Sequence, residues 1–227
     1  FLLPIDTFQS SVDIGRFTDI AADLGINRFD ISVGAIMDDF DNDGYLDIVE
    51  STWDAAGSMA YFRNRNGQTF EDRSVAAGLR EQLGGLYCVQ MDYDNDGWLD
   101  IYVANDSRPN FLLHNDGDGT FTESALTSGV ALNEEGRQEA GMGTDLGDFD
   151  NDGHQDIFLA SGMGFPFYYW PNHLMLNNGD GTFSDHAEDR GIEPPVQGHY
   201  HDKKIQDRDS VRSSRCAATA DFDGDGR

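Results

Sequence analysis

Short apolar segments alternate with clusters of Asp, Asn and Gly along the chain, and this pattern predicts β-strands joined by tight turns. Residues 99–103, for example, form an apolar segment that directly follows an acidic cluster. Asn, Asp and Gly tolerate positive φ angles, so the polar clusters are suited to reversing the chain. Helical periodicity is weak, and only residues 21–24 and 75–79 suggest a helical turn. The pattern therefore favours an all-β fold.

One acidic pattern, Asp-x-Asp-x-Asp-Gly-x-x-Asp, recurs along the chain. Three full copies occupy residues 39–47, 92–100 and 148–156. A fourth copy begins at residue 221 and reaches residue 227 before its last carboxylate. Because the copies keep phase with a second motif, chance does not explain them, and the chain is predicted to be a repeat protein.

The second motif is Phe-x-[Asp/Glu]-x5-Gly followed by an aliphatic residue. Its copies interleave with the acidic pattern and begin at Phe17, Phe70, Phe121 and Phe183. An aligned turn string precedes the last three copies and begins at Asn64, Asn115 and Asn177. Each unit is read as four short strands, which is the size of a propeller blade.

We therefore expect an all-β β-propeller built of four-stranded blades, each with one acidic loop. About three and a half blades are expected in this chain. Further blades, from the same or another chain, are expected to close the ring, because exposed sheet edges and apolar faces aggregate. The expected divisions are 1–26 (a closing strand of a preceding blade), 27–79, 80–130 and 131–192 (one blade each), and 193–227 (an insertion and the start of a further blade).

The aspartates of the acidic loops are predicted to bind calcium. Ca²⁺ takes six to eight oxygen ligands, and alternating carboxylates on a tight loop supply them. Side chains at loop positions 1, 3, 5 and 9 and the backbone carbonyl at position 7 are the expected ligands, which leaves the side chain at position 7 free to vary. Up to four ions are expected, the fourth in an incomplete loop. The predicted ligands are Asp39, Asp41, Asp43, Tyr45 and Asp47; Asp92, Asp94, Asp96, Trp98 and Asp100; Asp148, Asp150, Asp152, His154 and Asp156; and Asp221, Asp223, Asp225 and Arg227.

An EF-hand, a solvated turn and a magnesium site are the alternatives for these loops. Residues 39–50 match the EF-hand pattern through Glu50, but Val103 and Leu159 stand at the equivalent positions of the next two copies. The residues after each loop are typical of a strand, so Glu50 is expected to be an exposed strand residue. Mg²⁺ is less suited, because it requires octahedral geometry and retains its waters.

These motifs resemble the FG-GAP/VCBS repeats of calcium-binding β-propellers. The resemblance rests on Asp-Phe-Asp-Asn-Asp-Gly with a following Asp-Ile in residues 148–157, and on Asn-Gly-Asp-Gly-Thr-Phe in residues 178–183. Segments 104–111 and 135–143 are similar to the cartilage acidic protein-like (ASPIC/UnbV) branch. The resemblance covers about residues 17–227. It implies a propeller, usually of seven blades, in secreted or cell-surface proteins.

Two insertions carry candidate partner-binding residues. The aromatic insertion either packs on the propeller or forms a stacking surface for protein or sugar. Residues 193–218 contain a basic segment with three interpretations: a solvated loop, a transition-metal site formed by His199 and His201 with a carboxylate, or a lyase-type site with Lys or His as the base. The candidate residues are Phe165, Phe167, Tyr168, Tyr169 and Trp170 in the first insertion and His199 and His201 in the second.

Charge and missing motifs limit the function. The formal net charge of −27 repels nucleic acids and anionic membranes, and no apolar run is long enough for a membrane span. The sequence contains no nucleophile elbow, phosphate-binding loop or HExxH string. We therefore expect a secreted, periplasmic or cell-surface binding or scaffold module for protein or carbohydrate, and not an enzyme. The alternative is a propeller-type polysaccharide lyase or hydrolase that uses the two insertions.

Overall fold

A computed structural model of the protein describes residues 17–28, 31–53, 58–79, 85–162, 171–192 and 217–220. No helix within these residues is long and apolar enough to cross a membrane. Short strands dominate, and the elements in chain order are α1 (Ala21–Leu24), β1 (Ser32–Asp38), β2 (Asp47–Thr52), β3 (Ala60–Arg65), β4 (Thr69–Asp72), β5 (Gly85–Met91), β6 (Asp100–Arg108), β7 (Phe111–Asn115), β8 (Phe121–Glu123), α2 (Ala125–Ser128), β9 (Glu139–Gly147), β10 (Asp156–Ser161), β11 (His173–Asn177) and β12 (Phe183–Asp185).

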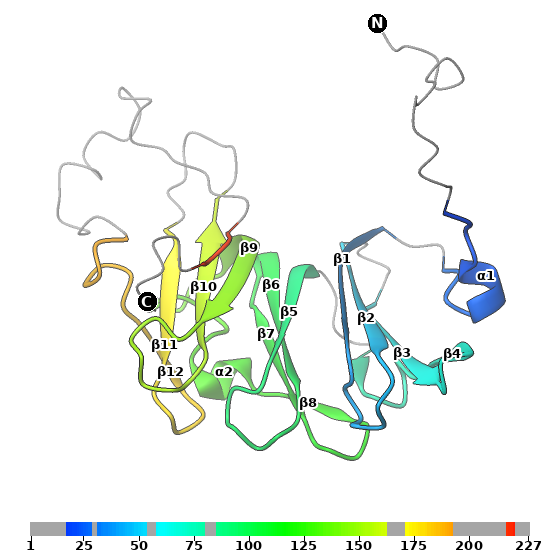
Figure 1. The fold of residues 1–227 in the computed structure, drawn as a ribbon. Helices are drawn as coiled ribbons and strands as arrows, with labels where there is room; N and C mark the ends of the chain where they lie inside the picture. Colours follow the sequence, from blue (N-terminus) through cyan, green and yellow to red (C-terminus); the bar gives the residue numbers. More distant parts are fainter. Residues whose placement is uncertain are drawn as a thin grey trace, which may run out of the picture.

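The strands form three antiparallel, four-stranded units that lie side by side (Figure 1). We name them blade 1 (β1–β4), blade 2 (β5–β8) and blade 3 (β9–β12). Consecutive strands pair within each blade, and the first strands of adjacent blades contact each other. The predicted all-β architecture of propeller blades is therefore confirmed.

Apolar side chains fill the spaces between the blades. Between blades 1 and 2, the rings of Phe40, Tyr61 and Phe121 meet edge to face, with centroids 6.0–6.4 Å apart. Between blades 2 and 3, a second cluster includes Tyr102 and Ile157, which are both fully buried. A strand enclosed on both faces has no polar side, and this explains the continuous apolar segments of the sequence.

A third, smaller apolar cluster lies on the face of blade 3 that points away from blade 2. It contains Leu174, Leu176 and Ala187, and it borders a cavity of about 430 Å³ that Ala217, Ala218 and Thr219 also line. In blades 1 and 2 the following blade covers the corresponding face. Residues 217–220 thus lie where the next blade packs in the other two units.

The Phe-x-acid-x5-Gly motif forms a capped turn after the fourth strand of each blade. Its acidic side chain accepts the backbone N–H two residues later, as Glu123 does from Ala125 at 2.8 Å at the start of α2. Asp72 and Asp185 cap the equivalent turns of blades 1 and 3. The turn of blade 2 ends at Gly129, where a Cβ atom would lie 3.1 Å from a backbone carbonyl of the next blade. The glycine therefore permits close packing between blades.

The pairing of β6 with β9 differs from the expectation of separate blades. β6 continues to Arg108, and Asp106 pairs with Ala140, so blades 2 and 3 share one eight-stranded sheet. A Cβ atom at Gly141 would lie 3.0 Å from the Cβ of Ala104. The glycine thus lets the two strands approach at this edge.

The segment after the first acidic loop is a strand, so residues 39–50 do not form an EF-hand. Glu50 lies within β2, paired with Ala35 of β1 and Ala60 of β3. The prediction that Glu50 is exposed is wrong, because flanking strands on both sides leave it half-buried.

Candidate metal sites in three acidic loops

The three described acidic loops have the same backbone turn. Each connects the first and second strands of a blade at the lower edge of Figure 1. In loop 1 (residues 39–47), the Asp39 carboxylate accepts the N–H groups of Asp43 at 3.0 Å and Gly44 at 2.8 Å. Loop 2 (92–100) and loop 3 (148–156) repeat both hydrogen bonds at 3.0 Å. The first aspartate of every loop is therefore held by its own backbone.

Two positions of each loop adopt left-handed backbone angles. The glycine at position 6 has φ between 89° and 92° in the three loops, as expected from its place in the motif. The asparagine at position 4 has φ between 54° and 62°, a conformation that asparagine tolerates better than most residues. This asparagine recurs at the same position of all three loops, a sequence signal that lies outside the Asp-x-Asp-x-Asp-Gly-x-x-Asp pattern.

Carboxylate oxygens converge in every loop. In each of three sets of aspartates, every carboxylate contributes one oxygen, and these oxygens lie within 4.8 Å of one another. The sets are Asp39, Asp41 and Asp43; Asp92, Asp94 and Asp96; and Asp148, Asp150 and Asp156. Both oxygens of Asp41 are buried, and Oδ2 forms an ion pair with the Nε atom of the Arg63 guanidinium. Hard divalent cations prefer such oxygen donors. The residues therefore fit Ca²⁺, and a cationic group already occupies part of loop 1.

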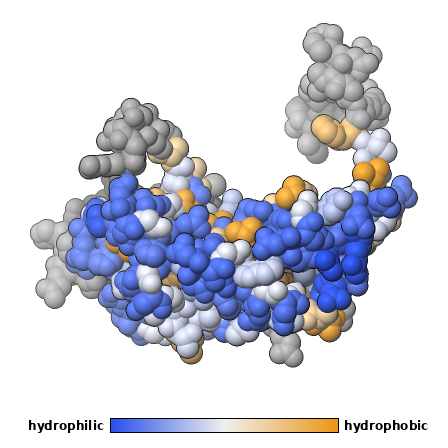
Figure 2. All heavy atoms as spheres, turned by 60° about the horizontal axis from the view of Figure 1, so that its bottom comes forward, coloured by the Kyte–Doolittle hydropathy of each residue, from blue (hydrophilic) through white to orange (hydrophobic). Residues whose placement is uncertain are grey.

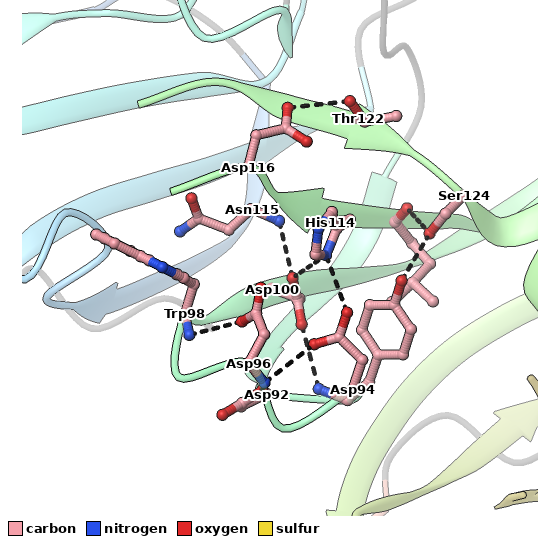
Figure 3. A network of polar contacts seen from close by, with 12 residues as sticks. Asp92, Asp94, Asp96, Trp98, Asp100, His114, Asn115, Asp116, Thr122 and Ser124 are labelled. Atoms are coloured by element: carbon pink, nitrogen blue, oxygen red, sulfur yellow. Dashed lines mark hydrogen bonds and ion pairs between the residues drawn. The ribbon is translucent and has the colours of Figure 1, made fainter. Parts of the chain in front are cut away.

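Figure 3 shows the polar network of loop 2. Asp94, Asp100 and His114 point toward one another, and the Nδ1 atom of His114 lies 3.2 Å from Asp100 and 3.5 Å from Asp94. These three residues form a further converging group within 4.8 Å. The imidazole thus comes from β7 and faces the carboxylates of the loop.

The ninth residue of each loop is a fully buried aspartate with hydrogen bonds to both oxygens. Burial raises the pKa of Asp47, Asp100 and Asp156, and that of Asp100 reaches about 7. Because at least one donor to each of these aspartates lies in the third strand of the blade, the aspartate connects the loop to that strand. The donors are the Tyr61 hydroxyl and Asn64 N–H for Asp47 (2.8 and 2.7 Å), the Tyr93 and Asn115 N–H groups for Asp100 (3.1 and 2.8 Å), and the Phe149 and Asn177 N–H groups for Asp156 (2.7 and 2.8 Å).

The seventh residue of each loop has a ring that lies over the turn between the third and fourth strands. A Cβ atom at Gly117 would lie 2.8 Å from the Trp98 indole nitrogen, and one at Gly179 would lie 2.8 Å from the His154 imidazole. Tyr45 occupies the same place above the turn of blade 1. The expectation that this side chain varies freely is therefore incomplete, because the ring covers a glycine.

The residue before the turn asparagine differs among the blades, and in blades 1 and 2 it faces the loop. In blade 1 it is Arg63, which forms ion pairs with Asp41 and, at 3.2 Å, with Asp43. In blade 2 it is His114, and in blade 3 it is Leu176, which is buried in the third apolar cluster. No repeat motif contains this position, so the sequence pattern does not identify it.

Adjacent loops also contact each other through their position-4 asparagines. The side chain of Asn42 donates to the carbonyl of Gly97 at 3.5 Å, and that of Asn95 lies 3.0 Å from the imidazole of His154. Figure 2, in which the lower side of Figure 1 is turned forward, shows a predominantly hydrophilic face. The three loops therefore form one continuous polar row.

The remaining predicted site residues lie outside the described part of the chain. They are Asp221, Asp223, Asp225 and Arg227 of the fourth loop, Phe165, Phe167, Tyr168, Tyr169 and Trp170 of the aromatic insertion, and His199 and His201 of the basic insertion.

Comparison with known proteins agrees with the repeat pattern. The profile of the FG-GAP-like repeat family matches residues 92–159 and 148–227. Cartilage acidic protein 1 of Homo sapiens is 31% identical over 158 residues, which cover 68% of this chain and 20% of that protein. The Mus musculus protein of the same name is 27% identical over 218 residues, 86% of this chain and 30% of its own length. The chain thus spans less than a third of these relatives.

One solved structure also matches part of the chain. Its title describes the specific recognition of non-reducing terminal N-acetylglucosamine by an Agrocybe aegerita lectin. The TM-score is 0.40 at 24% identity, over 66% of this chain and 36% of that one. A TM-score this low supports no conclusion about fold or ligand.

Proposed function

Because the chain belongs to the FG-GAP-like repeat family, in the branch related to cartilage acidic protein, we propose that its acidic loops bind Ca²⁺ and stabilise a propeller that serves as a binding or scaffold module. The observation that carries the proposal is the convergence of carboxylate oxygens within 4.8 Å in each of three loops with the same backbone hydrogen bonds. Ca²⁺ suits a flexible set of oxygen donors better than Mg²⁺ does.

The proposed ligands are the side chains at loop positions 1, 3, 5 and 9 and the carbonyl at position 7. A bound cation neutralises carboxylates whose mutual repulsion opposes folding of the loop. An ion that binds only the native state adds RT ln(1 + [L]/Kd) per site to the free energy of unfolding. The proposed effect of Ca²⁺ is therefore to hold together the first hairpin of each blade.

We further propose an extracellular or periplasmic location. Sites with Kd values of about 10⁻⁴–10⁻³ M are filled only at the calcium concentrations found outside cells. The name of the relatives refers to cartilage, and this supports an extracellular setting.

Protein or carbohydrate is the proposed class of partner. The net charge of −27 disfavours nucleic acids and anionic membranes. A protein and glycan array probed with the chain tests this part of the proposal, once in about 2 mM calcium, which fills weak sites, and once in excess EGTA, which empties them. Calcium-dependent binding to either class supports it, and binding only to nucleic acid or anionic lipid contradicts it.

Thermal unfolding in calcium and in excess EGTA tests the metal sites. Chelation is expected to lower the Tm by more than about 5 °C, since each filled site adds free energy to the native state. Asp150→Asn removes one carboxylate of the converging group in loop 3, and we expect it to reduce the difference between the two Tm values. Glu134→Gln makes the same charge change at an exposed residue outside the loops and serves as the control. An unchanged melting curve in EGTA contradicts the proposal.

A further inference from the structure

The three acidic loops carry nearly identical carboxylates but differ in one residue of the third strand. This residue precedes the turn asparagine and is Arg63 in β3, His114 in β7 and Leu176 in β11. It lies beside the loop of its own blade in blades 1 and 2, where it contacts two aspartates. The loops therefore offer Ca²⁺ three different environments.

In loop 1 the guanidinium of Arg63 forms ion pairs with carboxylates that the calcium ion requires as ligands. Its Nε atom forms an ion pair with Asp41, and a terminal nitrogen lies 3.2 Å from Asp43. Both aspartates belong to the converging group of this loop. A cation tethered to the neighbouring strand has a high effective concentration at these carboxylates and is displaced only at a free-energy cost.

In loop 3 the equivalent residue, Leu176, offers no charge. Among the described residues, no Lys, Arg or His forms an ion pair with Asp148, Asp150 or Asp152. Within the described part of the chain, the carboxylates of loop 3 are therefore available without displacement of a cationic side chain.

We infer that Arg63 is a built-in competitor of Ca²⁺, so that loop 1 binds the ion more weakly than loop 3. This inference rests on the proposed function of the loops. The Arg63 side chain is 32% exposed, so water and salt screen its ion pairs and limit the effect. The consequence is graded occupancy: loop 3 fills at low calcium, and loop 1 fills only when the ion displaces the guanidinium.

The position-6 glycines supply one reporter for each loop. The N–H groups of Gly44, Gly97 and Gly153 donate to the first aspartates of their loops at 2.8–3.0 Å, so ion binding to these carboxylates shifts their resonances. A calcium titration of the whole chain followed by ¹H–¹⁵N NMR therefore measures the three midpoints separately. We expect the Gly153 resonance to respond at the lowest calcium concentration and the Gly44 resonance to respond at a higher one.

Arg63→Met is the decisive variant, and Arg65→Met is its matched control. Arg65 lies on the same strand and pairs with Glu71, away from the loop carboxylates. Each variant replaces one arginine by methionine, so both change the net charge equally. Arg63→Met is expected to lower the calcium midpoint at Gly44 by about fivefold, while Arg65→Met leaves it within about twofold. Arg63→Gln is expected to lower the calcium midpoint at Gly44 as Arg63→Met does. Both variants lose the charge but differ in side-chain packing, so an equal effect assigns the change to the lost charge.

The outcomes distinguish the inference from the proposed function. If none of the three glycine resonances responds to calcium, the proposed function itself fails. If all respond but the Gly44 midpoint is the same in the wild type and both Arg63 variants, calcium binds and the role of Arg63 is overturned. An equal shift in Arg63→Met and Arg65→Met also overturns it, because net charge then explains the change.

Discussion

The side-chain amide of Asn115 donates a 2.8 Å hydrogen bond to the backbone carbonyl of Phe40, a residue of the preceding blade. The same amide nitrogen donates to the carbonyl of Leu99 at 3.1 Å. Phe40 belongs to loop 1 and Leu99 to loop 2, so one buried side chain connects two consecutive loops.

Blade 3 repeats this connection. Asn177 donates to the carbonyl of Tyr93 in loop 2 at 2.8 Å and to that of Gln155 in loop 3 at 3.2 Å. In blade 1, Asn64 donates to the carbonyl of Leu46 in its own loop. In blades 2 and 3 the first asparagine of the turn string therefore connects the blade to the preceding one, and in all three blades it bonds to its own acidic loop, from which it lies at a fixed distance.

We predict that Asn115→Ala destabilises the protein by about 2–4 kcal/mol, because it removes the amide donor from the buried Phe40 carbonyl and from the partly buried Leu99 carbonyl. Urea unfolding at fixed, saturating calcium measures this loss of free energy of unfolding. Asn178→Ala is the control, since Asn178 is exposed and, among the described residues, its side chain bonds only to the hydroxyls of Thr182 and Ser184. Equal stability losses in the two variants would contradict a special role for the buried amide.

Tyr61→Phe is expected to destabilise blade 1 by about 1–2 kcal/mol. The buried Tyr61 hydroxyl donates to Asp47 at 2.8 Å, and its removal leaves one oxygen of a fully buried carboxylate with one fewer donor. Urea unfolding in excess EGTA measures the change without a contribution from the ion. Tyr45→Phe, at a residue that is 40% exposed, is expected to have no measurable effect. No difference between the two variants would refute the prediction.

The repeat motifs predicted the blades because their residues act within a few positions of one another. Glycine at loop position 6 and the acidic cap of the helical turn, such as Glu123 beside Ala125, both act locally. The pairing of β6 with β9 could not be predicted, since it depends on the distance between two strands. Gly141 allows this approach, but a single glycine does not identify its neighbour in space.

The candidate site was predictable to the extent that its residues belong to the acidic pattern. Arg63 and His114 were missed because they are distant in sequence from the carboxylates they face and differ between repeats. The turn asparagines were quoted from the sequence, but their partners in other blades, such as Phe40, appear only in the folded chain. Contacts between repeats therefore need a structure, whereas contacts within a loop do not.

Gly153→Ala is expected to lower the free energy of unfolding by about 1–2 kcal/mol through backbone strain alone. The residue has a φ of 92°, which L-residues rarely adopt, and a Cβ atom there would meet nothing within 4 Å. Urea unfolding in EGTA measures this cost, and Asn replacement is expected to cost less, because asparagine tolerates left-handed angles. Equal free energies of unfolding for Gly153→Ala and the wild type would contradict the predicted backbone strain at this position.

The stability of the protein is predicted to fall at alkaline pH because of His173, a buried residue at the start of β11. Its Nδ1 atom lies 2.6 Å from Asp185, and its Nε2 atom lies 3.8 Å from Glu139. Burial alone lowers the pKa of His173, but the two carboxylates outweigh burial and raise the pKa to about 9. The native state therefore holds a proton that the unfolded chain, with a pKa of about 6.5, releases earlier.

The sign of the effect follows from proton binding. The stabilisation from the charged imidazole is complete below about pH 6.5 and is lost as the pH rises through about 9, with a total change of about 3 kcal/mol. Urea unfolding between these pH values, at constant saturating calcium, is expected to show this decline in the wild type and a flatter profile in His173→Gln. His186→Gln, at a histidine on the protein surface, is expected to keep the wild-type slope. A wild-type slope in His173→Gln would show that other groups cause the decline.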